Sequence, residues 1–187
     1  MKKFFLFQRH TDPQWPVWKR SLFWIWNLGW GLCAALGVGL VSLVFAAVIE
    51  QKAMLLSYFH NPLLAFLNLA PVVLLYFLLY FILGRAALSY GLTAAITLGF
   101  TMGNWFKLQF RNDPLMFEDL LLLKEAGNMA GKYQLFFTKT MVLALAAVLL
   151  GWLFLHLCVR GRPGARLRLL GFALAVRCAL AVWGMTQ

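Results

Sequence analysis

Five long apolar runs, separated by shorter polar stretches, set the pattern of this chain. The runs cover residues 22–49, 63–83, 86–106, 141–159 and 169–185. An α-helix needs about 20 mostly apolar residues to cross the hydrocarbon core of a bilayer, and each run is close to that length or longer. The pattern predicts an all-α fold: a polytopic membrane bundle of about five transmembrane helices over residues 22–187, with no soluble domain.

Two of the runs carry features typical of helices that pack within a membrane. The first opens with aromatic residues suited to the membrane interface, namely Trp24, Trp26 and Trp30. The third carries hydroxylated residues at helical spacing, which favour packing among other helices: Ser89, Thr93, Thr97 and Thr101. Gly99 and Gly103 form a GxxxG spacing, a weak signal for close helix approach because glycine-rich spans produce it by chance.

The largest polar region lies between the third and fourth runs, at residues 107–139. Asp113 followed by Pro114 is typical of a helix start, with Asp as N-cap and Pro at the first helical position. The following stretch is apolar over much of a helical circumference, yet four acidic residues fall between positions 113 and 125. Because so many acids are costly in hydrocarbon, we predict an external interfacial amphipathic helix here rather than another span.

Lysine and arginine concentrate on one side of this topology. That side carries ten of them: Lys2, Lys3, Arg9, Lys19, Arg20, Arg85, Arg160, Arg162, Arg166 and Arg168. The other side carries six, mixed with five acidic residues. The positive-inside rule places the side with ten in the cytoplasm. We therefore predict a basic cytoplasmic arm at residues 1–21, an extracellular C-terminus and a location in the cell (plasma) membrane.

The composition indicates that lipid is the natural solvent of this chain. Its 187 residues are 63% hydrophobic and 12% charged, against about a quarter charged in a typical soluble domain. The net charge of +11 does not indicate a nucleic-acid partner, because the bases lie in clusters between apolar runs and so favour anionic lipid headgroups. The three cysteines and three histidines lack metal-site spacing, so we expect no cofactor bound by this chain.

Two places stand out as candidate functional sites. The first is the external segment, whose charged residues are Lys107, Arg111, Asp113, Glu118, Asp119, Lys124, Glu125 and Lys132. These residues could hold a lipid headgroup, dock another domain, or form a solvated, self-paired brace for the bundle. The second is Arg177, near the middle of the fifth run, which either faces a partner, polar cavity or lipid phosphate, or extends to an interface.

The external segment also carries a family likeness. Residues 104–115 (NWFKLQFRNDPL), followed by Glu118-Asp119-Leu120, Lys124-Glu125-Ala126, Met129 and Lys132-Tyr133, resemble the N-terminal membrane module of lipoteichoic acid synthase-like phosphoglycerol transferases. In that family five transmembrane helices precede an extracellular domain of the sulfatase/alkaline phosphatase type. That domain moves glycerol phosphate from phosphatidylglycerol, using a threonine nucleophile and a divalent metal, usually manganese. None of its catalytic or metal-binding residues can be placed in this chain.

The resemblance implies a membrane anchor and positioning module, not catalytic alone, which holds an extracellular sulfatase-type domain beside an anionic phospholipid such as phosphatidylglycerol. The chain stops at Gln187, at the outer edge of the fifth run, and we interpret it as a fragment or a short degenerate product. One alternative is a small multi-pass transporter or flippase-like subunit that uses Arg177 and a polar cavity near the third run. Another is a structural membrane partner of a separate enzyme.

Overall fold

The computed structural model describes residues 15–50, 60–111, 116, 138–159 and 161–185, and the regular elements within them are α-helices. These helices are α1 (Val17–Glu50), α3 (Pro62–Leu83), α4 (Ala86–Arg111), α7 (Lys139–Cys158) and α8 (Ala165–Met185). All five are long and apolar enough to cross a membrane. The predicted fold class, a helical bundle with five membrane-spanning segments, is confirmed, and the chain is a multi-pass membrane protein.

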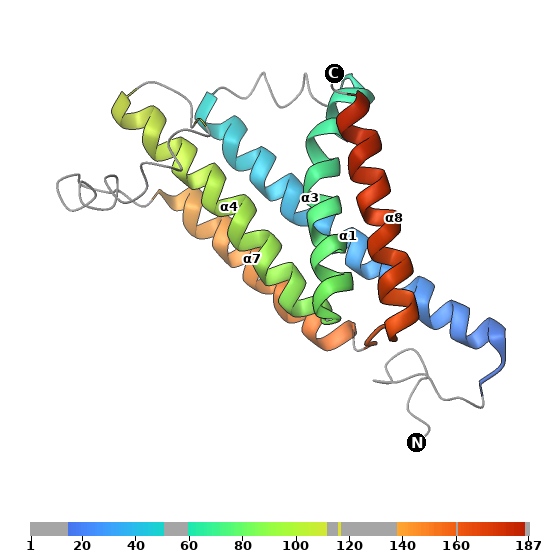
Figure 1. Cartoon of the computed structure of the whole chain (residues 1–187). Helices are drawn as coiled ribbons and strands as arrows, with labels where there is room; N and C mark the ends of the chain where they lie inside the picture. Colours follow the sequence, from blue (N-terminus) through green and yellow to red (C-terminus); the bar gives the residue numbers. More distant parts are fainter. Residues whose placement is uncertain (1–14, 51–59, 112–115, 117–137, 160, 186–187) are drawn as a thin grey trace.

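Consecutive helices run in alternating directions (Figure 1), so the start of α1 and the end of α8 lie at opposite ends of the bundle. Helix α8 packs against α3, and α7 packs against α4 (Figure 1). Helix α1 crosses the bundle obliquely and contacts α3, α4 and α7. The end where α1 begins, here named the basic end, carries the described cations Lys19, Arg20, Arg85, Arg162, Arg166 and Arg168.

Helix α3 has local signals at both of its ends. At the start, the Asn61 side chain accepts a hydrogen bond from the backbone N–H of Leu63 at 3.1 Å, and Pro62 occupies the first helical position. At the end, Gly84 adopts a left-handed conformation with φ of 68°, and its N–H donates to the Tyr80 carbonyl at 2.8 Å. This turn reverses the chain and leads directly into α4.

Several helix boundaries differ from the predicted spans. Helix α1 begins at Val17, so residues 17–21, assigned to the cytoplasmic arm, are helical. Helix α4 continues past residue 106 to Arg111, and α8 begins at Ala165 rather than at 169. The extensions contain lysine and arginine, which are good helix formers although they interrupt an apolar run. The interfacial helix predicted within 107–139 lies outside the described residues, apart from the turns that belong to α4 and α7.

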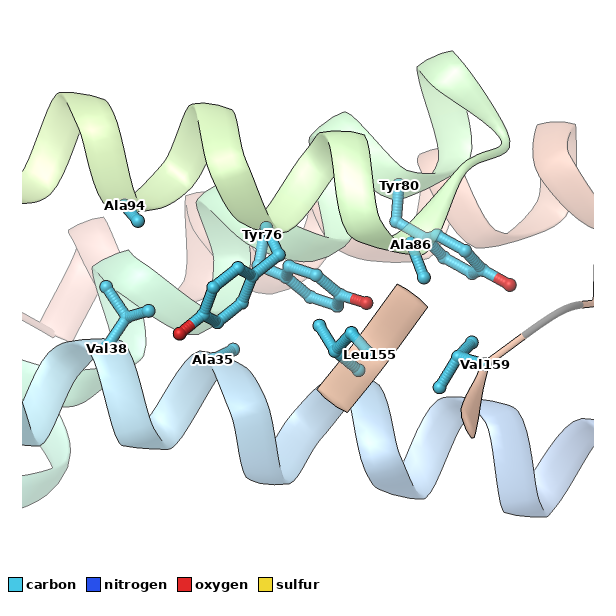
Figure 2. Packing of buried hydrophobic residues seen from close by; sticks show 9 residues of the cluster. Ala35, Val38, Tyr76, Tyr80, Ala86, Ala94, Leu155 and Val159 are labelled. Carbon is cyan, nitrogen blue, oxygen red and sulfur yellow. The ribbon is translucent and has the colours of Figure 1, made fainter. Parts of the chain in front are cut away.

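The main core lies where α1, α3, α4 and α7 meet (Figure 2). Tyr76 and Tyr80 on α3 are almost fully buried, and their rings stack with centroids 6.1 Å apart. They pack against small residues on neighbouring helices, including Ala35 of α1 and Ala86 of α4. Small side chains let helix backbones approach closely, which is how helices gain packing energy where lipid removes the hydrophobic driving force.

Glycines make room for aromatic rings at three helix contacts. A β-carbon added at any of these glycines would collide with the ring of the neighbouring helix; the pairs are Gly31 with Tyr76, Gly151 with Tyr90, and Gly171 with Phe81. By contrast, a β-carbon on Gly99 or Gly103 would meet nothing within 4 Å. Thus the GxxxG spacing does not mediate helix approach among the described residues, whereas isolated glycines facing aromatic residues do.

The outer surface of the bundle is strongly apolar. Large side chains on α7 and α8 are exposed, among them Leu143, Leu149, Leu170, Leu174 and Trp183. A water-soluble monomer rarely exposes a continuous apolar surface of this kind. It is compatible with contact with the lipid bilayer.

Candidate functional site

The structure describes only one edge of the predicted external site. Lys107 is half-buried near the last turns of α4, and Arg111 is the last residue of that helix. The remaining members of the set, Asp113, Glu118, Asp119, Lys124, Glu125 and Lys132, lie outside the described residues. A headgroup or docking role for this segment therefore stays a prediction.

Arg177 lies on an exposed face of α8. It is eight residues before the end of that helix at Met185, or about 12 Å along the helix axis. Helix α8 packs on α3, and its buried residue near this point is Ala175, while Leu174 and Leu180 are exposed. The guanidinium is therefore not directed into a polar cavity formed by the described helices.

The hydroxyl groups of α4 are bonded within their own helix. Ser89, Thr93, Thr97 and Thr101 each donate to the carbonyl four residues earlier, at 2.8–2.9 Å. Since Thr101 uses its one proton in this way, Ser42 of α1 is the donor in their 2.6 Å contact. These groups join helices and satisfy backbone acceptors. These hydroxyl groups do not line a polar channel between the described helices.

A pocket of about 500 Å³ lies between α1 and α7, beside Tyr90 of α4. Its other lining residues are apolar or small, including Trp30, Val41, Leu150 and Phe154. Leu150 is 67% exposed, so the pocket belongs to the outer, apolar surface of the bundle. Its chemistry suits a hydrocarbon chain rather than a polar solute.

A second pocket, of about 520 Å³, lies at the basic end and is here named the basic pocket. It is formed by the start of α4, the end of α7 and the segment that leads into α8. Three of its side chains are basic or titratable, namely Arg85, His156 and Arg162. Leu88, Trp152 and Leu157 provide apolar surface. Of the two pockets, this one is lined by cationic side chains.

Local structure fixes the two arginines of the basic pocket. The left-handed turn at Gly84 places Arg85 directly before α4. Arg162 follows Gly161, whose backbone N–H donates to the buried side chain of Asn27 on α1 at 3.4 Å. A β-carbon on Gly161 would collide with the ring of Phe23, so α1 and this segment approach closely. The pocket is therefore built on contacts between residues 134 positions apart.

His156 is held by an aromatic neighbour on its own helix. Its ring stacks on Trp152, one turn earlier on α7, with centroids 5.6 Å apart and an interplanar angle of 14°. Both side chains line the basic pocket and both are exposed. The stacked pair forms one wall with a polar edge and an apolar face.

Among the described residues, the one acidic residue is Glu50, the last residue of α1. Helix α1 ends at the face of the bundle opposite to the basic end, so Glu50 is not a carboxylate partner for the basic pocket. In the sequence, Arg85 and Arg162 contribute only to the prediction of orientation, and His156 is one of the three histidines that lack metal-site spacing. The sequence did contain a signal for an anion site: Arg85 occupies the position before α4, where Ser, Thr, Asp or Asn is preferred.

Among the described residues, no group of three or more His, Cys, Asp and Glu side chains could hold a metal ion. The divalent metal implied by the family likeness therefore has no ligand set in these helices. Comparison with protein families, curated proteins and solved structures finds no match to this chain.

Proposed function

We propose that this chain is the membrane anchor and positioning module of a lipoteichoic acid synthase-like phosphoglycerol transferase. The sequence likeness of residues 104–133 supports the family, and the alternation of five helices supports the geometry. The arrangement of the helices carries the proposal: most of the described cations lie at the end where α1 begins, and α8 ends at the opposite face. With the basic end in the cytoplasm, a domain joined after α8 is held on the outer surface of the plasma membrane.

In this proposal the chain supplies position, and a sulfatase-type extracellular domain supplies the chemistry. Phosphoryl transfer requires a nucleophile and positioned charge, commonly with a metal ion. We assign these groups, with their divalent metal, to that domain. The anchor keeps the domain beside phosphatidylglycerol in the outer leaflet, which removes the need for a diffusive encounter with a lipid substrate.

A transporter or flippase-like subunit is less well supported by the described helices. The hydroxyl groups of α4 are bonded to their own backbone, and Arg177 lies on the outer surface of α8. A structural partner of a separate enzyme differs from the anchor proposal only in whether the catalytic domain is covalently joined. The DNA after the Gln187 codon distinguishes these two, because the anchor proposal expects a reading frame there that encodes a sulfatase-type domain.

Orientation is tested by labelling single cysteines in intact cells. The native Cys33, Cys158 and Cys178 are first replaced by serine, and one cysteine is introduced at Met116 or at Gly164, both exposed positions. A membrane-impermeant maleimide should label Met116→Cys in intact cells, and Gly164→Cys only after permeabilisation. Labelling in the reverse order would overturn the topology and the proposed function with it.

The division of labour is tested with the purified 187-residue chain in vesicles of phosphatidylglycerol. We expect no release of diacylglycerol from these vesicles, with or without added Mn²⁺. Sustained release would show that the chain is itself the transferase, and the anchor proposal would then be wrong.

A further inference from the structure

We propose that the basic pocket binds the phosphate of an anionic phospholipid at the basic end of the bundle. This inference goes beyond the proposed function, since it concerns the membrane face opposite to the one where α8 ends. It assigns a ligand to Arg85, Arg162 and His156, and it does not depend on a transferase domain. A fixed lipid here would join α4, α7 and the segment that leads into α8 at their common end.

The positive charge of the basic pocket is uncompensated at this end of the bundle. Arg85 and Arg162 line one pocket, and the one acidic residue among the described residues, Glu50, ends α1 at the opposite face. Two cations held near each other repel, and a shared anion between them converts that repulsion into attraction. Guanidinium groups match phosphate oxygens in pairs of parallel hydrogen bonds, so a phosphate is the anion that this pair fits best.

Arg85 lies directly before the first turn of α4. The first-turn residues Ala86, Ala87 and Leu88 line the pocket, and their backbone N–H groups have no acceptor within the helix. A cation at the positive end of a helix dipole is electrostatically unfavourable. A phosphate bound there would accept from the free N–H groups and neutralise Arg85 together with the helix end. The pocket thus combines side-chain and backbone donors around one volume.

The apolar side chains of the basic pocket favour a lipid over a soluble phosphate. The apolar residues of the pocket are exposed, with 46% exposure for Leu88, 41% for Trp152 and 52% for Leu157. Tryptophan is the residue most typical of the membrane interface, with its ring in the headgroup region. A phosphate held by the arginines would therefore have apolar side chains beside it for its acyl chains. The volume of about 520 Å³ is ample for a headgroup.

One competing occupant belongs to the chain itself. Asp12 is the single acidic residue before Glu50, and it lies in the N-terminal arm outside the described residues. If its carboxylate filled the pocket, lipid would be excluded. The variant Asp12→Asn separates the two cases, because removal of a competitor would strengthen lipid binding, whereas our proposal expects no change beyond about twofold.

The test measures lipid binding by the full chain purified in a neutral detergent. Thermal unfolding is followed during titration with dioleoyl phosphatidylglycerol, with dioleoyl phosphatidylcholine and with soluble glycerol 3-phosphate. A ligand that binds only the folded state stabilises it by RT ln(1 + [L]/Kd), so the rise in melting temperature with lipid concentration yields an apparent dissociation constant. We expect concentration-dependent stabilisation by phosphatidylglycerol, and none by the other two at equal concentration.

A matched pair of variants makes the test specific to the pocket. Arg85→Gln/Arg162→Gln should weaken phosphatidylglycerol binding by about tenfold or more, because both charge-assisted contacts are lost. Arg20→Gln/Arg166→Gln removes the same charge from the same end outside the pocket, and it should change the affinity by no more than about twofold. If the first variant does not fold, Arg85→Lys/Arg162→Lys replaces it, with an expected loss of about threefold or more because paired hydrogen bonds are lost while charge is kept.

Three outcomes would overturn the proposal. Equal losses in the two variants would show a general attraction of lipid to surface charge. Stabilisation by glycerol 3-phosphate as strong as that by the lipid would show a soluble-phosphate site. A gain in affinity in Asp12→Asn of about tenfold would show that the arm occupies the pocket. None of these results bears on the transferase assignment, which is tested by topology and by diacylglycerol release.

Discussion

The ring of Tyr90 on α4 fills the space that a β-carbon on Gly151 of α7 would need. Tyr90 is almost fully buried, so its ring cannot swing out to accept a larger neighbour at no cost. This contact brings α4 and α7 together, and Gly31 with Tyr76 does the same for α1 and α3. Glycine opposite an aromatic ring is thus a recurrent way in which this bundle closes its helix contacts.

We predict that Gly151→Ala destabilises the protein by about 1–3 kcal/mol, the usual cost of forcing an extra carbon into a packed contact. The measurement is the free energy of unfolding in lipid bicelles. Gly99→Ala is the matched control, since a β-carbon there meets nothing within 4 Å and alanine is the better helix former. Equal effects of the two substitutions would contradict the proposed packing.

Arg168 ties α8 to the end of α3. Its Nε donates to the carbonyl of Phe81 at 2.9 Å, and its Nη2 donates to the carbonyl of Ile82. These are carbonyls of the last turn of α3, which have no partner within the helix. The guanidinium therefore serves as a side-chain cap for a helix that ends at Leu83.

Arg168→Lys should cost about 1 kcal/mol of stability, because an ammonium keeps the charge but cannot reach both carbonyls in the same geometry. Arg166→Lys, on an exposed position of the same helix turn, should change stability by less than about 0.5 kcal/mol. Melting temperatures in one detergent compare the two variants directly. An equal change in both would show that Arg168 acts only through its charge.

Removal of the buried hydroxyl of Tyr80 is expected not to lower the stability of the protein, unlike the substitutions of Gly151 and Arg168. Its oxygen is buried and has no hydrogen-bond partner among the described residues, and the ring packs in the main core. A buried hydroxyl without a partner loses its hydration without compensation. Tyr80→Phe should therefore leave stability unchanged or raise it by about 1 kcal/mol, while Tyr80→Ala should lower it by about 3–5 kcal/mol. A loss on Tyr80→Phe comparable with that of Tyr80→Ala would reveal a hydrogen bond to this oxygen.

The apolar runs were enough to predict the number and order of the helices, because span length is set by bilayer thickness and is local in sequence. The helix contacts could not be predicted in the same way. The approach of Gly151 to Tyr90 depends on the rotation of two separate helices about their axes, and no local pattern fixes that rotation. For the same reason the GxxxG of Gly99 and Gly103 indicated a contact that the described helices do not make.

The basic pocket shows the same limit for the site. The basic residues were visible in the sequence, but the pocket that Arg85 and Arg162 line was not. The segment that carries Arg162 is held against α1 by the bond between Asn27 and Gly161, which are 134 positions apart. The available signal for that bond was Asn27 itself, a polar residue inside the first apolar run. A buried amide in a membrane requires a hydrogen-bond partner. The external segment around Asp119 lies outside the described residues, and its headgroup or docking role stays a prediction.

Arg177 allows the anchor and transport hypotheses to be separated by one substitution. An arginine on a lipid-facing helix surface costs about 2.5–3.5 kcal/mol when it lies at the membrane centre. Because Arg177 is exposed on α8, Arg177→Leu should raise the stability of the protein in bicelles, or leave it unchanged, and should preserve surface localisation of a domain fused after α8. Arg177→Lys serves as the charge-retaining control. A carrier that used this cation for its substrate would instead lose uptake or lipid scrambling in reconstituted vesicles with leucine and retain it with lysine. Loss of folding in Arg177→Leu alone would show that the guanidinium has a partner that the exposed face of α8 does not reveal.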